Sequence, residues 1–214
     1  LKCRDRTGFN PAFYNADSVS AQQEKINQNP HFVYLAYFAP GVIKVGISQE
    51  ERGIRRLLEQ GARLALKLET FASALIARQY EAKIARLDGV VETMPIHKKL
   101  ELIKQPFDRA DGEEKLQQKL LEIEQKIGVS FPKVKLITCE DYFHTAGVDL
   151  ARVVLMKDQN QLAGRVRSII GPILITDYDG QLLAYNVKKF IGYQARKIDG
   201  AIDIEIPSTQ LALF

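Results

Sequence analysis

The sequence predicts an α+β protein in which a small sheet with flanking helices is followed by a small antiparallel β domain. Two observations lead to this prediction. Up to about residue 130, short strand-like segments alternate with segments whose apolar residues have helical spacing. Beyond that point, short strand-like segments follow one another. With 214 residues and 46% hydrophobic content, the chain can form one large domain or two small ones.

The first structured unit is expected over residues 31–94, after a polar, turn-rich lead-in at residues 1–30. The expected elements are strands at 31–38 and 42–47, a helix at 50–60, a strand at 65–71 and a helix at 73–87. Pro40-Gly41 marks the turn of the first hairpin. Gly61 is expected to end the first helix, and Ser73 is expected to be the N-cap of the second.

The second half of the chain is expected to comprise connecting helices, a β unit and a short tail. Residues 95–130 contain the helical patterns, residues 131–206 the β unit, and residues 207–214 the tail. The expected helices are at 96–104 and 113–127, and the expected strands at 134–139, 151–156, 164–170, 173–178, 181–188 and 191–196. Asp179-Gly180 is a strong signal for a tight hairpin turn.

Charge and cysteine content limit the possible class of protein. The net charge is +4, and residues 140–214 contain eight basic and nine acidic side chains, so the first 139 residues carry +5. This mild basic excess permits a nucleic-acid partner without requiring one. Two cysteines make no disulfide framework, which favours a cytoplasmic location. The longest apolar runs are too short to span a membrane, so no membrane partner is expected.

Residues on the first three elements and on the helix at 73–87 form a recognisable set. Phe32-Val33-Tyr34 lies on the first strand and Lys44-Val45-Gly46 on the second, with Tyr34 and Gly46 twelve positions apart. The next helix carries Arg52, Arg55 and Arg56, and the later helix carries Arg78 and Glu81. This arrangement resembles the GIY-YIG nuclease fold, a three-stranded antiparallel sheet with flanking helices that cuts phosphodiester bonds.

The resemblance implies a role for each of these residues. Hydrolysis of a phosphodiester needs a base for water, a cation for the non-bridging oxygens and a metal for the leaving oxygen. By resemblance, Tyr34 is the base, with its pKa lowered by Lys44 and the metal, while Arg56 binds phosphate. Glu81 is then the ligand of one Mg²⁺ or Mn²⁺, and Lys44 replaces the family's second tyrosine. Arg52, Arg55 and Arg78 are expected to contact nucleic acid.

A narrower resemblance extends over most of the chain. The sequences of residues 31–36, 44–48, 59–62, 78–81 and 190–193 resemble an uncharacterised prokaryotic family with a GIY-YIG-like core. Some members of that family have upstream cysteine pairs that suggest zinc. Only Cys3 is present at that end of this chain, so an N-terminal zinc site is not expected here. This resemblance implies no established activity.

The pattern around Glu81 indicates a carboxylate that faces the sheet. Ala74, Ala77 and Ile84 lie on the same helical stripe, and a carboxylate on that stripe needs a partner. The partner is either a metal ion or a cation, of which Arg55, Arg56 and Lys44 are the candidates.

Two further alternatives concern the tyrosine and the lysine. Tyr34 is either a catalytic base or an ordinary aromatic of the strand, and Lys44 can hold phosphate but cannot copy a phenol's proton chemistry. A two-residue turn at Pro40-Gly41 would place Tyr37 across from Lys44. A three-residue loop would return Tyr34 to the face of Lys44.

The last five residues, Gln210-Leu211-Ala212-Leu213-Phe214, resemble the QLxLF peptide by which bacterial replication and repair proteins attach to the DNA sliding clamp. Gln210, Leu211, Leu213 and Phe214 carry the resemblance, which implies the bacterial β sliding clamp as a partner. Large apolar groups at a chain end suit weak, reversible binding in a partner's pocket. The alternative is an edge strand that ends in an apolar plug within the protein itself.

One further group of basic and aromatic residues lies in the β unit. Arg165, Arg167, Lys188 and Lys189 are interleaved with Tyr185, Phe190 and Tyr193, which indicates either a surface that stacks nucleic-acid bases or a barrel with an aromatic core and a basic exterior.

The sequence as a whole therefore predicts a DNA-binding protein. We expect a metal-dependent endonuclease or a DNA-structure-binding factor of repair or replication, delivered by the clamp. The alternative is a non-catalytic module that binds nucleic acid or protein. A small-molecule enzyme is disfavoured because neither a P-loop nor a GxGxxG motif is present.

Overall fold

The computed structural model describes residues 21–156, 160–200 and 204–207. The helices are α2 (Ala21–Asn27), α3 (Gly53–Gln60), α4 (Ala74–Ile84), α5 (Ile96–Ile103) and α6 (Arg109–Ile127). The strands are β1 (His31–Ala39), β2 (Val42–Gln49), β3 (Leu64–Phe71), β4 (Val90–Val91), β5 (Lys135–Thr138), β6 (Val154–Leu155), β7 (Arg165–Ile170), β8 (Ile173–Tyr178) and β9 (Gln181–Asn186). Short 3-10 helices are η2 (Glu50–Arg52), η3 (Glu140–Tyr142), η4 (Leu150–Arg152) and η5 (Val187–Phe190). The α+β class is confirmed.

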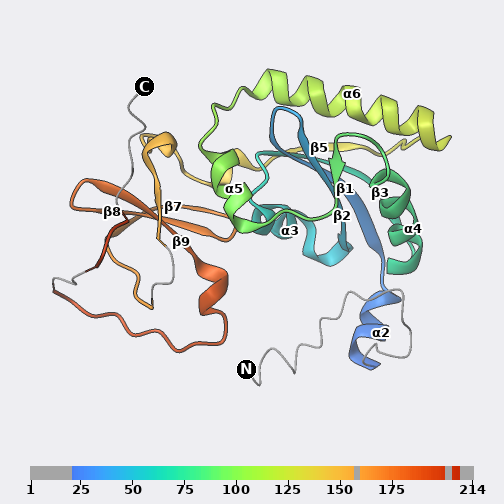
Figure 1. The fold of residues 1–214 in the computed structure, drawn as a ribbon. Coiled ribbons are helices and arrows are strands. Elements are labelled where there is room, and N and C mark those ends of the chain that lie inside the picture. The colour runs from blue at the N-terminus through green and yellow to red at the C-terminus, as the bar shows by residue number, and fades with distance from the viewer. Residues whose placement is uncertain (1–20, 157–159, 201–203, 208–214) are drawn as a thin grey trace.

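The first sheet has five strands in the order β4-β2-β1-β3-β5 (Figure 1). The pairs β1-β2, β1-β3 and β3-β5 are antiparallel, whereas β4 runs parallel to β2, so the sheet is mixed. The prediction of three antiparallel strands therefore lacked the two edge strands of this sheet, β4 and β5. Strand β4 has only two residues, too few for a periodic pattern, and β5 was expected in the second β unit because it follows Pro132.

The register of the first hairpin decides between the two turn alternatives. Ala39 pairs with Val42 across Pro40-Gly41, and a bulge between Tyr37 and Ala39 shifts the pairing by one residue. Lys44 is consequently opposite Ala36, and Tyr34 is opposite Gly46. Side chains directly opposite each other share a face, so Tyr34 and Lys44 lie on the same face of the sheet. The bulge thus has the effect that was expected only from a longer loop.

Helix termini follow local chemistry, with one boundary that the sequence did not predict. The Ser73 side chain accepts a hydrogen bond from the backbone N–H of Ile76 at 3.5 Å, as expected for the N-cap of α4. Gly61 ends α3 in the left-handed region at φ 73°. Helix α6 begins four residues earlier than expected, at Arg109, because Asp108 accepts a hydrogen bond from the N–H of Asp111 at 2.9 Å.

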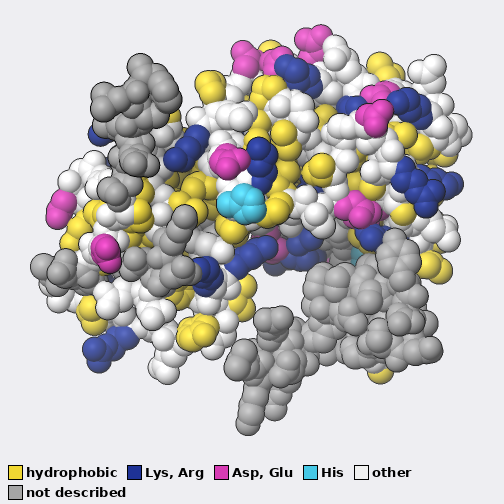
Figure 2. All heavy atoms as spheres, in the orientation of Figure 1, with side chains coloured by type: hydrophobic (Ala, Val, Ile, Leu, Met, Phe, Trp, Pro, Cys, Tyr) yellow, Lys and Arg dark blue, Asp and Glu magenta, His cyan; other side chains and the backbone are white. Residues whose placement is uncertain are grey.

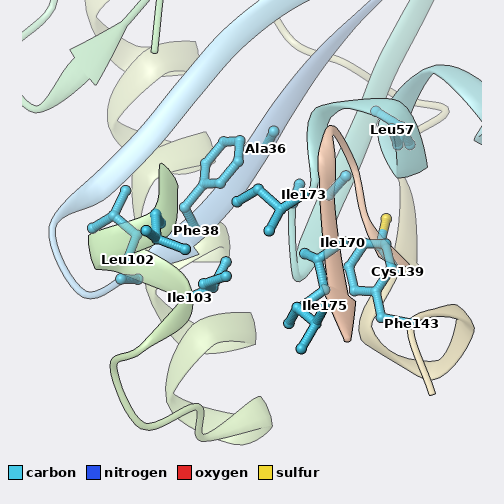
Figure 3. Packing of buried hydrophobic residues seen from close by; sticks show 14 of the residues in the cluster. Ala36, Phe38, Leu57, Leu102, Ile103, Cys139, Phe143, Ile170, Ile173 and Ile175 are labelled. Atoms are coloured by element: carbon cyan, nitrogen blue, oxygen red, sulfur yellow. The ribbon is translucent and has the colours of Figure 1, made fainter. Parts of the chain in front are cut away.

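The two faces of the first sheet are covered by different elements. On one face Val33, Leu35 and Tyr37 pack with residues of α4 and α6. On the other face the core includes residues of α5 and of the second sheet (Figure 3). The labelled side chains that meet there are Ala36, Phe38, Leu57, Leu102, Ile103, Cys139, Phe143, Ile170, Ile173 and Ile175. The two sheets therefore share one core, and the second sheet is packed against the first.

The second sheet has the strand order β6-β9-β8-β7, in which β6 runs parallel to β9 and the other pairs are antiparallel. This sheet is therefore mixed, and the prediction of a purely antiparallel β domain is wrong at its β6 edge. Asp179 and Gly180 have positive φ angles of 50° and 81° in the turn between β8 and β9, so the predicted hairpin is confirmed. The prediction of a strand at 191–196 is wrong, because this segment is irregular and exposed. Among the described residues, no helix combines the length and apolar character needed to cross a membrane.

Candidate functional site

A pocket of about 330 Å³ lies beside strand β2 and is lined by side chains from α2, β1, β2, α3 and α4. The residues predicted as catalytic, Tyr34, Lys44, Arg56 and Glu81, all line it. Arg52 and Arg78, predicted to contact nucleic acid, also line this pocket. Arg55 does not, and instead lines an adjacent hollow with Glu51, Arg52 and Glu59. The structure thus brings together six of the seven residues singled out in the nuclease-like core.

The pocket lies where the outer edge of the first sheet is open. Strand β4 pairs only with Ile43 and Lys44, so the rest of β2 has no second strand partner within the described residues. Residues 46–49 of this open edge line the pocket. The short β4 therefore leaves a strand edge accessible beside the predicted site residues.

Tyr34 is fully buried, and its position depends on the glycine across the hairpin. A Cβ atom at Gly46 would lie 2.4 Å from the Tyr34 hydroxyl, which is far inside van der Waals contact. Glycine at this position therefore makes room for the phenol. Burial raises the pKa of Tyr34, whereas the guanidinium of Arg56 opposes that rise. Lys44 is not among the charged groups that act on Tyr34, so the lowering expected from Lys44 is not observed, while the lowering expected from a bound metal stays a prediction.

The Tyr34 hydroxyl has no partner at ideal hydrogen-bond geometry among the described residues, but the Arg56 guanidinium acts on it both through its charge and as a side-chain hydrogen-bond donor. Arg56 is thus the group that polarises the buried phenol.

Glu81 is buried, with 5% of its surface exposed, on the inward stripe of α4 that Ala74, Ala77 and Ile84 define. The predicted inward orientation is thus confirmed. Its carboxylate forms an ion pair with Arg78, which also lies 3.5 Å from Glu92. The ion-pair partner of Glu81 is therefore Arg78, which lies three residues earlier on the same helix and so is a neighbour on its surface. None of the predicted partners Arg55, Arg56 and Lys44 forms an ion pair with Glu81 in the described structure. Burial raises the pKa of Glu81, and Arg78 opposes this.

Lys44 points into the same pocket and is 7% exposed. Its Nζ donates hydrogen bonds to the backbone carbonyls of Val45, at 3.0 Å, and of Glu92. Burial lowers the pKa of Lys44 to about 8, while the charge of Glu81 acts in the opposite direction. The amine is thus held by backbone oxygens beside Glu81.

The pocket includes polar residues that the sequence reasoning missed. Ser48 is buried and its hydroxyl has no hydrogen-bond partner among the described residues. It follows Lys44 and Gly46 at intervals of two on β2, so strand periodicity alone could have placed it on the same face. His31 donates a hydrogen bond from Nδ1–H to the backbone carbonyl of Asn29 at 2.8 Å, and burial lowers the pKa of His31.

The charges that line the pocket favour an anionic ligand. Four cations, Lys44, Arg52, Arg56 and Arg78, face two carboxylates, Glu81 and Glu92. Part of this charge is already compensated, since Arg52 pairs with Glu59 and Arg78 with Glu81. Guanidinium and ammonium groups beside a phenol suit the oxygens of a phosphate group.

Metal ligands are sparse in the described part of the chain. No group of three or more His, Cys, Asp or Glu side chains gathers there in a way that could hold a metal ion. Any cation held in the pocket by Glu81 would therefore keep water in most of its coordination positions.

The predicted clamp-binding residues Gln210, Leu211, Leu213 and Phe214 lie outside the described residues. In the second sheet, Tyr185 is a core residue, 2% exposed, whose hydroxyl accepts a hydrogen bond from the N–H of Ala163 at 3.2 Å. Tyr193 is instead 76% exposed. Tyr185 therefore belongs to the aromatic core of this unit, whereas Tyr193 lies on its surface.

No curated protein and no solved structure matches this chain. A family model does match, over residues 14–195, which include the first sheet, the pocket and the second sheet. The expected membership of an uncharacterised family is confirmed: the chain belongs to the family described as "Protein of unknown function (DUF2797)".

Proposed function

We propose that this protein is a DNA-associated, divalent-metal-dependent endonuclease with a GIY-YIG-like core. The observation that supports this proposal is the meeting of Tyr34, Lys44, Arg56 and Glu81 in one pocket. These residues come from four different elements, β1, β2, α3 and α4, and each matches in sequence a position of the GIY-YIG site. A pocket that combines cations, a phenol and an inward carboxylate suits a phosphodiester better than an uncharged ligand.

In this proposal the cations hold the phosphate and Tyr34 handles the proton. Arg56 and Lys44 bind the non-bridging oxygens and stabilise the charge that develops on them. The raised pKa of Tyr34 keeps its proton on at neutral pH, so the phenol must lose that proton before it can act as a base. The charges of Arg56 and Arg52 favour that loss.

The donor set in the pocket fits a largely hydrated Mg²⁺ or Mn²⁺. Glu81 is a buried carboxylate that would hold the ion, and Glu92 lies on the same pocket wall. When bound, such an ion supplies compensation for the negative charge on the leaving oxygen. In the structure, Arg78 forms an ion pair with the Glu81 carboxylate. A metal ion bound to Glu81 would therefore displace Arg78, which could then bind a phosphate oxygen.

The decisive experiment is a cleavage assay on nicked, branched and single-stranded DNA with Mg²⁺ or Mn²⁺. Glu81→Gln keeps the size of the side chain and removes its charge, so we expect cutting to fall by at least about a hundredfold. Glu114→Gln, an exposed acid on α6, is the matched control and should cut as the unmodified protein does. Equal cutting by the Glu81 variant would overturn the assignment of the site.

A second candidate function is a non-catalytic module that binds nucleic acid or protein. Two observations favour it: Lys44 replaces the second tyrosine, and Glu81 is already paired with Arg78. A salt-bridged carboxylate is a common structural feature of a folded domain. The absence of cutting on every DNA tested, with retained DNA binding, would support this module over the enzyme.

We also propose that residues 210–214 attach the protein to the bacterial β sliding clamp during DNA repair or replication. The resemblance of Gln210, Leu211, Leu213 and Phe214 to a clamp-binding peptide supports this proposal. Tethering would raise the local concentration of the pocket near DNA, so the intrinsic affinity for DNA can stay low. The mild net charge of +4 agrees with such an arrangement.

A further inference from the structure

A buried lysine between the two sheets is subject to the charge of other cations. Lys99 of α5 is 5% exposed, donates a hydrogen bond from Nζ to the carbonyl of Gln60 at 2.5 Å, and lies 5.4 Å from the centre of the Phe38 ring. The charged groups that act on it are Lys188, Lys44 and Arg56, and no acid is among them. Burial and these like charges lower the pKa of Lys99 to about 7.

These cations come from four elements and connect the pocket to the second sheet. Arg56 on α3 and Lys44 on β2 line the pocket, while Lys188 is an exposed residue of η5, directly after β9. We call Arg56, Lys99 and Lys188 the cationic path, in which the buried Lys99 contributes only its charge, whereas Arg56 and Lys188 are accessible to a ligand. Figure 2 shows Lys and Arg side chains along the recess at the centre of the view, between the two halves of the molecule. Like charges held together in this way favour binding of an anion that spans them.

The cationic path continues into a second hollow of about 640 Å³. Lys189, adjacent to Lys188, lines this hollow together with Phe190, Tyr193 and Arg196. Tyr193 is 76% exposed, so its ring is accessible to a ligand in this hollow. An exposed tyrosine between a lysine and an arginine can stack on a base while the cations bind the adjoining phosphates.

We propose that one single strand of nucleic acid runs from the pocket along the cationic path to the second hollow, where Tyr193 stacks on an unpaired base. This inference rests on the proposed function, because it extends the same pocket into a binding track. A single strand fits better than a duplex, since paired bases do not offer their faces to a tyrosine. An acidic peptide could neutralise the path but offers no regular series of planar rings to Tyr193.

Fluorescence anisotropy with labelled oligonucleotides tests the track without metal, so that binding is measured apart from cutting. We expect the unmodified protein to prefer single-stranded DNA to a duplex of the same length. Tyr193→Ala should weaken binding of the single strand about fivefold or more, and Lys188→Glu should weaken it to a similar degree. Both side chains are exposed, so neither change should prevent folding.

Matched controls separate the track from general effects of charge or aromatic content. Tyr142→Ala removes another exposed tyrosine, 55% exposed on η3, and Lys133→Glu reverses another exposed lysine. Both control proteins should bind the single strand within about twofold of the unmodified protein. If the control variants lost as much single-strand affinity as the Tyr193 and Lys188 variants, the inference would be overturned.

Failure of the track and failure of the proposed enzyme give different results. Absence of single-strand binding, a preference for duplex, or binding that ignores Tyr193 overturns the track, whatever the cleavage assay shows. Binding that depends on Tyr193 in a protein that never cuts DNA supports the track and contradicts only the endonuclease. If polyglutamate displaced the labelled single strand as well as an unlabelled single strand does, the track would also be overturned, since the cationic path would then recognise charge alone.

Discussion

The buried amine of Lys99 makes the stability of the protein depend on pH in a defined direction. Its pKa falls from an ordinary 10.5 to about 7 on folding, so in between these values the unfolded chain binds more protons than the native chain. Stability therefore rises with pH through this range. Between about pH 6.5 and about pH 8.5, Lys99 should add about 2 kcal/mol to the free energy of unfolding. Lys44, with a pKa lowered to about 8, should add about 1 kcal/mol more.

Urea denaturation at both pH values, for the unmodified protein and for Lys99→Met, measures this effect. Methionine has a similar length and no charge, so the variant should keep only the smaller rise of about 1 kcal/mol that comes from Lys44. Lys98→Met, on the exposed side of the same helix, is the matched control and should retain the full rise. The reasoning is refuted if Lys99→Met shows the same pH dependence as the unmodified protein.

Two further predictions concern the glycine at Tyr34 and the tail. Gly46→Ala should lower the free energy of unfolding by about 1–3 kcal/mol and also impair DNA binding or cutting, because the new Cβ displaces Tyr34. In the control variant Gly112→Ala, a Cβ would lie 2.8 Å from Leu64, so this change should destabilise the core without affecting the pocket. Urea denaturation and the DNA assays distinguish the two variants. Deletion of residues 210–214 should abolish pull-down by the sliding clamp and leave the thermal midpoint unchanged, whereas unfolding of the second sheet would favour the apolar-plug alternative.

The sequence predicts well where one element alone determines the outcome. The inward orientation of Glu81 follows from the 3.6-residue period of α4, and the hairpin at Asp179-Gly180 follows from the positive φ that these residues tolerate. In both cases the local pattern and the tertiary structure agree. The α+β class follows from the same local patterns taken in order.

Predictions failed where the outcome depended on a contact between distant segments. Strand β5 pairs with β3, about seventy residues earlier, and nothing in its own sequence selects that partner over the second sheet. The bulge between Tyr37 and Ala39 has no local signature either, yet it sets the face of Tyr34. Arg78 as the partner of Glu81 could have been predicted from helical spacing, but the candidates Arg55, Arg56 and Lys44, which lie earlier in the sequence, were favoured.

The shared core explains how a pocket on one sheet and a hollow beside the other can serve one ligand. Leu57 of α3 and Ile170 and Ile173 of the second sheet belong to the same buried cluster, so no flexible linker separates the two sheets (Figure 3). Gly61 and Gly171 approach so closely that a Cβ at Gly171 would lie 2.6 Å from the Gly61 nitrogen. Such close packing fixes the second sheet against the C-terminal end of α3, and Arg56 lies one turn earlier on this helix. The cationic path therefore has a fixed length, and a strand of nucleic acid would bind to a preformed track without a domain closure.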